Sequence, residues 1–162
     1  MTQVTLEYMI MIPILILQIF LFPIAAVAIM GAWSNSRMTI ELQDISGHLG
    51  SSIQQLYYTI NHASISSGSL TAKVDVPTTI PDGDKSYNYL ITLSNATNSN
   101  SAVKVMNLTL SLIGANGQAS TLVTLGQNAN WQDKSTLKSN SFSLICATKT
   151  SSTISLSFQG GA

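Results

Sequence analysis

Few side chains in this sequence have the types and spacing needed for acid–base, nucleophilic or metal chemistry. His48 and His62 are 14 residues apart, which is about 21 Å along a helix, so the two imidazoles cannot share a metal ion. The triplet Asp82-Gly83-Asp84 has the first ligands of a calcium loop without the later ones, and it predicts an ordinary turn instead. We therefore expect no metal site.

The motifs of common enzymes and nucleotide sites are also missing. Serine, histidine and aspartate all occur, but there is no G-x-S-x-G nucleophile motif, phosphate-binding loop, zinc spacing or dinucleotide fingerprint. Lys and Arg balance Asp and Glu at seven each, so no basic patch is available to neutralise the phosphates of a nucleic acid. We expect no enzymatic activity, no cofactor and no nucleic-acid partner.

Three residues are candidates for modification or redox chemistry. Asn95 and Asn107 begin N-x-[ST] sequons, the acceptor pattern for N-glycosylation. Asn95 lies in a polar stretch expected to be a loop, whereas Asn107 lies in an expected strand and must face outward to be modified. Cys146 is the only cysteine, so it cannot form an intrachain disulfide, and the apolar run around it predicts a small buried residue.

One apolar segment dominates the N-terminal part of the chain. No charged residue occurs between Tyr8 and Trp33, and about 20 apolar residues are enough to cross a bilayer as a helix. The segment is longer than the apolar core of a secretory signal peptide and has no basic residue before it. Pro13 and Pro23 are expected to bend the helix without ending it, because packed neighbours can satisfy the freed carbonyls. We therefore expect membrane insertion at some stage.

The helix is expected to continue to about residue 63. From Arg37 onward, apolar residues recur every three or four positions opposite a polar face, which is the pattern of an amphipathic helix. The apolar positions are Met38, Leu42, Ile45, Leu49, Ile53, Leu56 and Ile60. Gly47 and Gly50 each weaken the helix by about 1 kcal/mol but leave the period intact. Such a helix is much longer than a membrane anchor requires.

After residue 69 the apolar period changes to that of a strand. Alternating segments separated by turn-rich connections predict six strands, with Asn116-Gly117 as a hairpin turn. The segments are residues 70–76, 87–93, 103–113, 120–125, 142–147 and 153–158. We therefore predict an α+β fold, in which a long hydrophobic and amphipathic N-terminal α-helix is followed by a small antiparallel β-sandwich.

The sequence thus predicts two regions. The helix occupies residues 1–66, with an apolar assembly or transmembrane half at 8–33 and an amphipathic half at 37–63, and the β-sandwich head domain occupies residues 67–162. Charged residues make up 9% of the chain, against about 25% in typical globular domains. A surface covered by hydroxyl and amide groups suits an extracellular, glycosylated exterior.

The stretch QVTLE, which begins at Gln3 and precedes the apolar helix, resembles the class III signal-peptide motif Q-x-S-x-E of archaeal type IV pilin-like proteins, with Thr5 in place of the serine. The resemblance implies cleavage by a prepilin-type peptidase between Thr2 and Gln3. Glu7 would then be the fifth residue of the mature chain, where a glutamate pairs with the N-terminal amine of another subunit. Leaders of this family usually carry Lys or Arg ahead of the cleavage site, and only Met1 and Thr2 precede Gln3 here. Either most of the leader has been omitted, or the mature chain starts at Met1, which would move Glu7 two residues further in.

The resemblance also implies a function and a location. The chain is expected to be the major structural subunit, the pilin, of an archaeal extracellular type IV-like filament. It would be inserted in the cytoplasmic membrane before an assembly platform adds it to a helical homopolymer on the cell surface. The candidate assembly residues are Gln3, Glu7, Pro13 and Pro23. Adhesion, motility and DNA uptake are all compatible with such a filament. The alternative is a monomeric membrane-anchored extracellular domain for binding or adhesion, although the long amphipathic half disfavours it.

Overall fold

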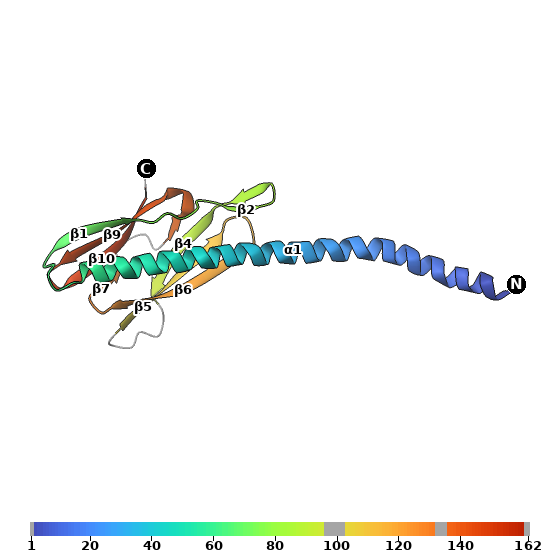
Figure 1. Cartoon of the computed structure of the whole chain (residues 1–162), viewed down its shortest axis with the longest axis horizontal. Coiled ribbons are helices and arrows are strands. Elements are labelled where there is room, and N and C mark those ends of the chain that lie inside the picture. Colours follow the sequence, from blue (N-terminus) through green and yellow to red (C-terminus); the bar gives the residue numbers. More distant parts are fainter. Residues whose placement is uncertain (1, 96–102, 132–135, 161–162) are drawn as a thin grey trace. The chain divides into compact units, whose positions relative to one another are not determined.

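The computed structural model describes residues 2–95, 103–131 and 136–160 (Figure 1). The chain begins with one long helix, α1 (Thr2–Ile60), and continues with β-strands, so the predicted α+β class is confirmed. It divides into two compact units, residues 1–36 and residues 37–162. This division differs from the boundary placed after residue 66, because the amphipathic half of α1 belongs to the same unit as the strands.

The described residues of the second unit form ten strands and one short 3-10 helix. The elements are β1 (Gly68–Lys73), β2 (Ile80–Asp82), β3 (Lys85–Tyr87), β4 (Tyr89–Asn95), β5 (Val103–Leu112), β6 (Gln118–Gly126), β7 (Ala129–Trp131), β8 (Thr136–Lys138), η1 (Ser139–Ser141), β9 (Phe142–Thr150) and β10 (Thr153–Gly160). All six predicted strands are present. The four additional strands, β2, β3, β7 and β8, have three residues each, which is too short to show an apolar period.

The strands form two four-stranded sheets with the orders β1-β9-β10-β7 and β6-β5-β4-β8, and β2 and β3 form a separate ribbon. The pairing is antiparallel except between β10 and β7, which are parallel. The β5–β6 hairpin is confirmed, but its connection is longer than a two-residue turn. Leu112 N–H donates to the carbonyl of Gly117 (2.9 Å), and Gly114, at φ 86°, takes the left-handed conformation that favours glycine.

The amphipathic half of α1 forms part of the core of the second unit. All seven predicted apolar positions are buried, with at most 7% of any side chain exposed. They share one hydrophobic cluster with inward-facing residues of β4, β5, β6, β9 and β10, and Figure 1 shows this part of the helix running alongside the strands. Gly50 lies against β6, because an added Cβ would stand 3.3 Å from the methyl groups of Thr121 and Val123. The helical stripe predicted from the sequence is therefore confirmed.

Polar contacts fix the helix on β6 as well. Ser46 is fully buried, and its Oγ lies 2.7 Å from the hydroxyl of Thr121 while it donates to the carbonyl of Gln43. Further along the helix, the Gln54 amide donates to the hydroxyl of Thr124 (2.8 Å). Because a buried hydroxyl needs a partner, the pair of Ser46 and Thr121 specifies how the helix aligns with the strand.

The helix ends at Ile60, three residues before the predicted end at residue 63. Its last turn is tied to the β6–β7 connection by a ring of three side chains. The Tyr57 hydroxyl donates to Asn128 Oδ1 (2.5 Å), Asn128 Nδ2 donates to Asn61 Oδ1 (2.9 Å), and Asn61 Nδ2 donates to the Tyr57 hydroxyl oxygen (3.3 Å). These hydrogen bonds hold the chain where it leaves the helix.

Cys146 is partly exposed, so the prediction that it is buried was wrong. Its neighbours on β9, Ile145 and Ala147, are both fully buried. Since successive side chains of a strand point to opposite faces, Cys146 faces away from the core.

Candidate assembly surface

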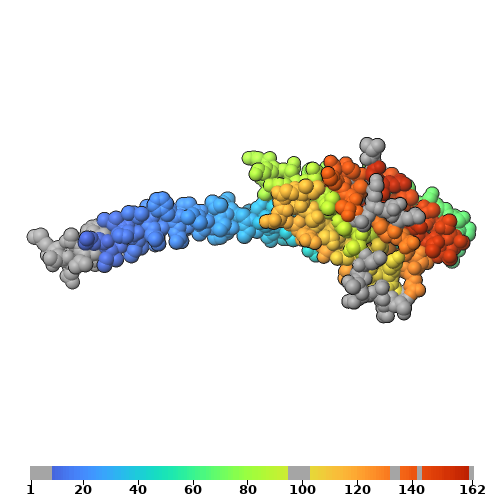
Figure 2. Space-filling view, turned by 180° about the vertical axis from the view of Figure 1, so that it is seen from behind, coloured from blue at the N-terminus to red at the C-terminus, as the bar shows by residue number. Residues whose placement is uncertain are grey.

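The first half of α1 exposes apolar side chains on every side. Between Met9 and Trp33, every large apolar side chain is 50–77% exposed. An α-helix has 3.6 residues per turn, so the four consecutive exposed residues 14–17 point in four different directions. Figure 2 shows these side chains, in blue, as a continuous surface. A surface that surrounds the helix cannot be covered by a single partner helix.

This half of the helix has the dimensions of a membrane span. Among the described residues, one helix is long and apolar enough to cross a membrane by length and composition, and none of its apolar window is buried. Soluble monomers rarely expose apolar patches of more than a few hundred Å². The surface therefore needs cover from lipid or from other protein chains.

Both prolines lie inside α1, which continues past each of them, as the sequence predicts. Each proline lines a shallow groove on the helix surface. The first groove, of about 590 Å³, is lined by Pro13, Ile16, Leu17, Phe20, Leu21 and Ile24. The second, of about 690 Å³, is lined by Leu15, Gln18, Ile19, Leu21, Phe22, Pro23 and Ala25. Such grooves can receive the side chains of an adjacent helix.

The residues proposed for processing and amine pairing lie at the start of α1. Thr2, Gln3 and Glu7 are helical, and their side chains lie outside the described residues. The roles implied for Gln3 and Glu7 therefore stay predictions.

The two candidate glycosylation sites differ in their setting. Asn95 is the last residue of β4, paired with Met106, so its assignment to a loop was wrong. Its side chain and the rest of its sequon lie outside the described residues. Asn107 lies in β5 between the buried side chains of Met106 and Leu108 and is itself only partly buried. Its side chain therefore faces outward, as modification requires.

The histidine and aspartate residues considered as metal ligands do not come together in one metal site. His48 and His62 are both exposed, and no group of three or more His, Cys, Asp or Glu side chains that could hold a metal occurs in the described ranges. Asp82-Gly83-Asp84 forms the turn of the β2–β3 ribbon, with Gly83 at φ 59°. The prediction of a turn is confirmed.

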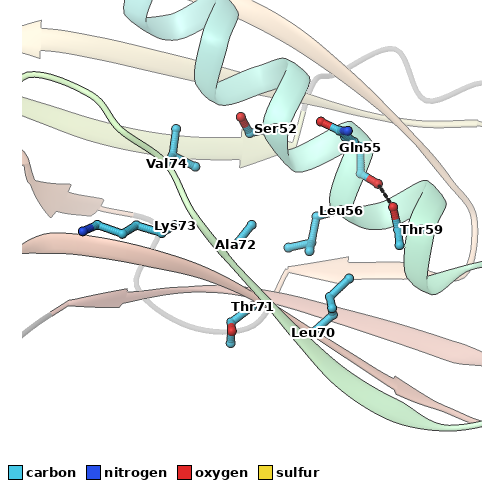
Figure 3. Close-up of a pocket in the computed structure, with 9 residues that line it drawn as sticks. All are labelled: Ser52, Gln55, Leu56, Thr59, Leu70, Thr71, Ala72, Lys73 and Val74. Carbon is cyan, nitrogen blue, oxygen red and sulfur yellow. Dashed lines mark hydrogen bonds between the residues drawn. The ribbon is translucent and has the colours of Figure 1, made fainter.

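A groove between α1 and β1 in the second unit was not predicted. Figure 3 shows the side chains that line it. Its volume is about 320 Å³. It is lined by Ser52, Gln55, Leu56 and Thr59 of the helix and by Leu70, Thr71, Ala72, Lys73 and Val74 from the β1 segment. The Thr59 hydroxyl donates to the carbonyl of Gln55 (2.8 Å). Lys73 is the one charged residue in the lining, so the groove offers shape and hydrogen bonds without an acid–base pair.

No sequence pattern predicts this groove, because its position depends on the pairing of β1 with β9, which is distant in the chain. Of the surfaces described, the apolar half of α1 is much the larger, and it lacks charge. No protein-family model, curated protein or solved structure matches the chain.

Proposed function

We propose that this chain is the structural subunit of an extracellular filament of the archaeal type IV type. In this proposal, copies bundle the apolar halves of their helices in the filament core and carry their β-domains on the outside. One observation carries the proposal. Residues 9–33 expose apolar side chains on every side, whereas the buried core residues all come from residue 38 onward.

The energetics favour cover on all sides of the apolar half. Seventeen large apolar side chains between Met9 and Trp33 are exposed. Fully burying such a side chain contributes about 1.5–3 kcal/mol, so covering the whole surface contributes on the order of tens of kcal/mol per copy. A bilayer and a bundle of like helices both provide this cover, because lipid tails are about as apolar as leucine. Transfer from membrane to filament therefore depends on close packing and on specific polar contacts.

The second unit needs no such cover, because the amphipathic half of α1 already lies in its core. A chain that lacks residues 9–33 is therefore expected to give a soluble monomer with an intact β-domain, which size-exclusion chromatography and circular dichroism would measure. Filaments formed by this deletion variant would contradict the proposal.

Electron microscopy of filaments sheared from the cell surface tests the proposal directly. We expect lipid-free filaments whose main component, by mass spectrometry, is this chain. Replacement of Glu7 by Ala tests the amine-pairing role in the same preparation. An unchanged filament yield from the Glu7→Ala strain would exclude that role and leave the filament proposal intact.

A membrane-anchored extracellular binding domain is the second candidate, and the groove between α1 and β1 favours it. A pocket of about 320 Å³ is at the lower end of the range for small-ligand sites. In this case the chain would stay in the membrane fraction until detergent is added, and shearing would release no filaments that contain it. The two candidates therefore predict opposite distributions of the chain.

A further inference from the structure

We infer that Gln18 sets the axial register between neighbouring copies by donating a hydrogen bond to the backbone carbonyl of Ile19 in the next helix. This inference rests on the filament proposed above and adds a positioning residue to it. The partner is a second copy of this chain, presenting the same apolar half.

Gln18 is the one polar side chain between Met9 and Trp33. It is exposed and has no hydrogen-bond partner within the described chain. A glutamine amide has two N–H donors and one carbonyl acceptor. Leaving such a group unpaired in apolar surroundings is unfavourable by about 1–3 kcal/mol, so a bundle that covers Gln18 must supply it with a partner.

Pro23 leaves an acceptor open one residue away from Gln18. In an α-helix the N–H of a residue bonds to the carbonyl four residues earlier, but proline has no N–H to donate. The carbonyl of Ile19 therefore lacks its usual partner. Gln18, Ile19 and Pro23 line the same groove of the helix surface, so the unpaired donor and the open acceptor belong to one contact face.

A second chain is needed to join the donor and the acceptor. Side chains in a helix tilt toward its N-terminus, whereas backbone carbonyls point toward its C-terminus, so the Gln18 amide points away from the Ile19 carbonyl of its own chain. The other carbonyl opened by a proline is that of Met9, four residues before Pro13. It is nine residues from Gln18, and Gln18 does not line the groove at Pro13.

This pairing limits how neighbouring helices can be offset. The Gln18 amide reaches toward the N-terminus of its helix, and the Ile19 carbonyl points toward the C-terminus of the neighbouring helix. In parallel helices the two groups therefore meet only when one copy is shifted along the other by between one and two turns, roughly 5–10 Å. Apolar side chains alone specify such a shift weakly, and single polar residues in otherwise apolar helix interfaces are known to fix register. The amide would therefore select one offset among many that bury similar apolar area.

Replacement of Gln18 by Met in the full-length chain tests the inference, because methionine keeps the unbranched shape and removes both amide groups. We expect Gln18→Met filaments to assemble but to lose the sharp layer lines that a single helical symmetry produces in electron micrographs. Pro23→Ala should have the same effect, since it returns an N–H to the Ile19 carbonyl. Gln43→Met is the matched control, since it makes the same chemical change at an exposed position of α1 outside the apolar half, and it should keep the layer lines of the unmodified chain.

A reconstruction of the unmodified filament should place the Gln18 amide within hydrogen-bond distance of an Ile19 carbonyl of another copy. Gln18→Met filaments with the same rise and twist as the unmodified chain would overturn the register role. Unchanged order in Pro23→Ala filaments would overturn the assignment of the acceptor. The absence of filaments from the unmodified chain would instead contradict the proposed function, so the two failures can be told apart.

Discussion

Replacement of Ile53 by Ala measures how much the helix contributes to the core of the second unit. Ile53 lies in the amphipathic half of α1 and is fully buried. Ile→Ala substitutions in a core destabilise by about 2–5 kcal/mol, because burial is lost and a cavity remains. Alanine has a better helix propensity than isoleucine, which offsets a few tenths of a kcal/mol of this loss. The expected loss is a large share of the roughly 5–15 kcal/mol that stabilises a typical domain.

The assay is equilibrium urea unfolding of a fragment that comprises residues 37–162. The sequence has two tryptophans, and this fragment keeps only Trp131, so its fluorescence has a single source. Trp131 packs edge to face against Phe158 of β10, with ring centroids 4.7 Å apart. Its emission is therefore expected to change when the sheet opens, and the shift in midpoint gives the loss of unfolding free energy.

Ile40→Ala is the matched control, since it makes the same chemical change in the same helix at a side chain that is 60% exposed. We expect it to change the unfolding free energy by less than about 0.5 kcal/mol. Similar losses for Ile53→Ala and Ile40→Ala would refute the packing of the helical stripe in the core. A loss below about 0.5 kcal/mol for Ile53→Ala would refute it as well.

Three further predictions concern the second unit and can use the same fragment. Gly126→Ala should destabilise it by at least about 1 kcal/mol, because an added Cβ would overlap the Tyr57 hydroxyl; a stability equal to that of the unmodified fragment in urea unfolding would contradict this. Burial raises the pKa of Tyr89 from 10 to about 12. The stabilisation that its neutral hydroxyl gives to the folded state is therefore fully present below pH 10 and is lost as the pH rises through 12. Each pKa unit corresponds to about 1.4 kcal/mol, and solvent screening leaves a fall of about 2 kcal/mol in the unfolding free energy. Tyr89→Phe should abolish this fall when the unfolding free energy is measured against pH. Asn107→Gln should change stability by less than about 0.5 kcal/mol because its side chain faces outward, and mass spectrometry of the native chain tests whether Asn107 carries a glycan.

Sequence reasoning was most successful where a regular period coincides with burial on one face. The seven apolar positions from Met38 to Ile60 are all buried, because a spacing of three and four places them on one side of a helix regardless of what covers them. The period-two segments located all six longer strands for the same reason. The uncharged run of residues 9–33 likewise determined that this surface needs cover from lipid or from other protein chains.

The Cys146 prediction failed where the period was ambiguous. The run FSLICA has apolar residues on both faces of a strand, so it is compatible with either register, and a shift of one residue exchanges the two faces. Pairing with β1 and β10 places Ile145 and Ala147 in the core and turns Cys146 outward.

By itself, then, the sequence determined the helix, its two different halves and most of the strands, because these depend on interactions between residues that are close in the chain. Only the tertiary structure decided the strand order, the parallel pairing of β7 with β10, and the groove between α1 and β1. It also decided the ring of hydrogen bonds among Tyr57, Asn61 and Asn128. These features join segments that are distant in sequence, and their partners are selected by the shape and hydrogen-bonding groups of the assembled core, which local periodicity does not encode.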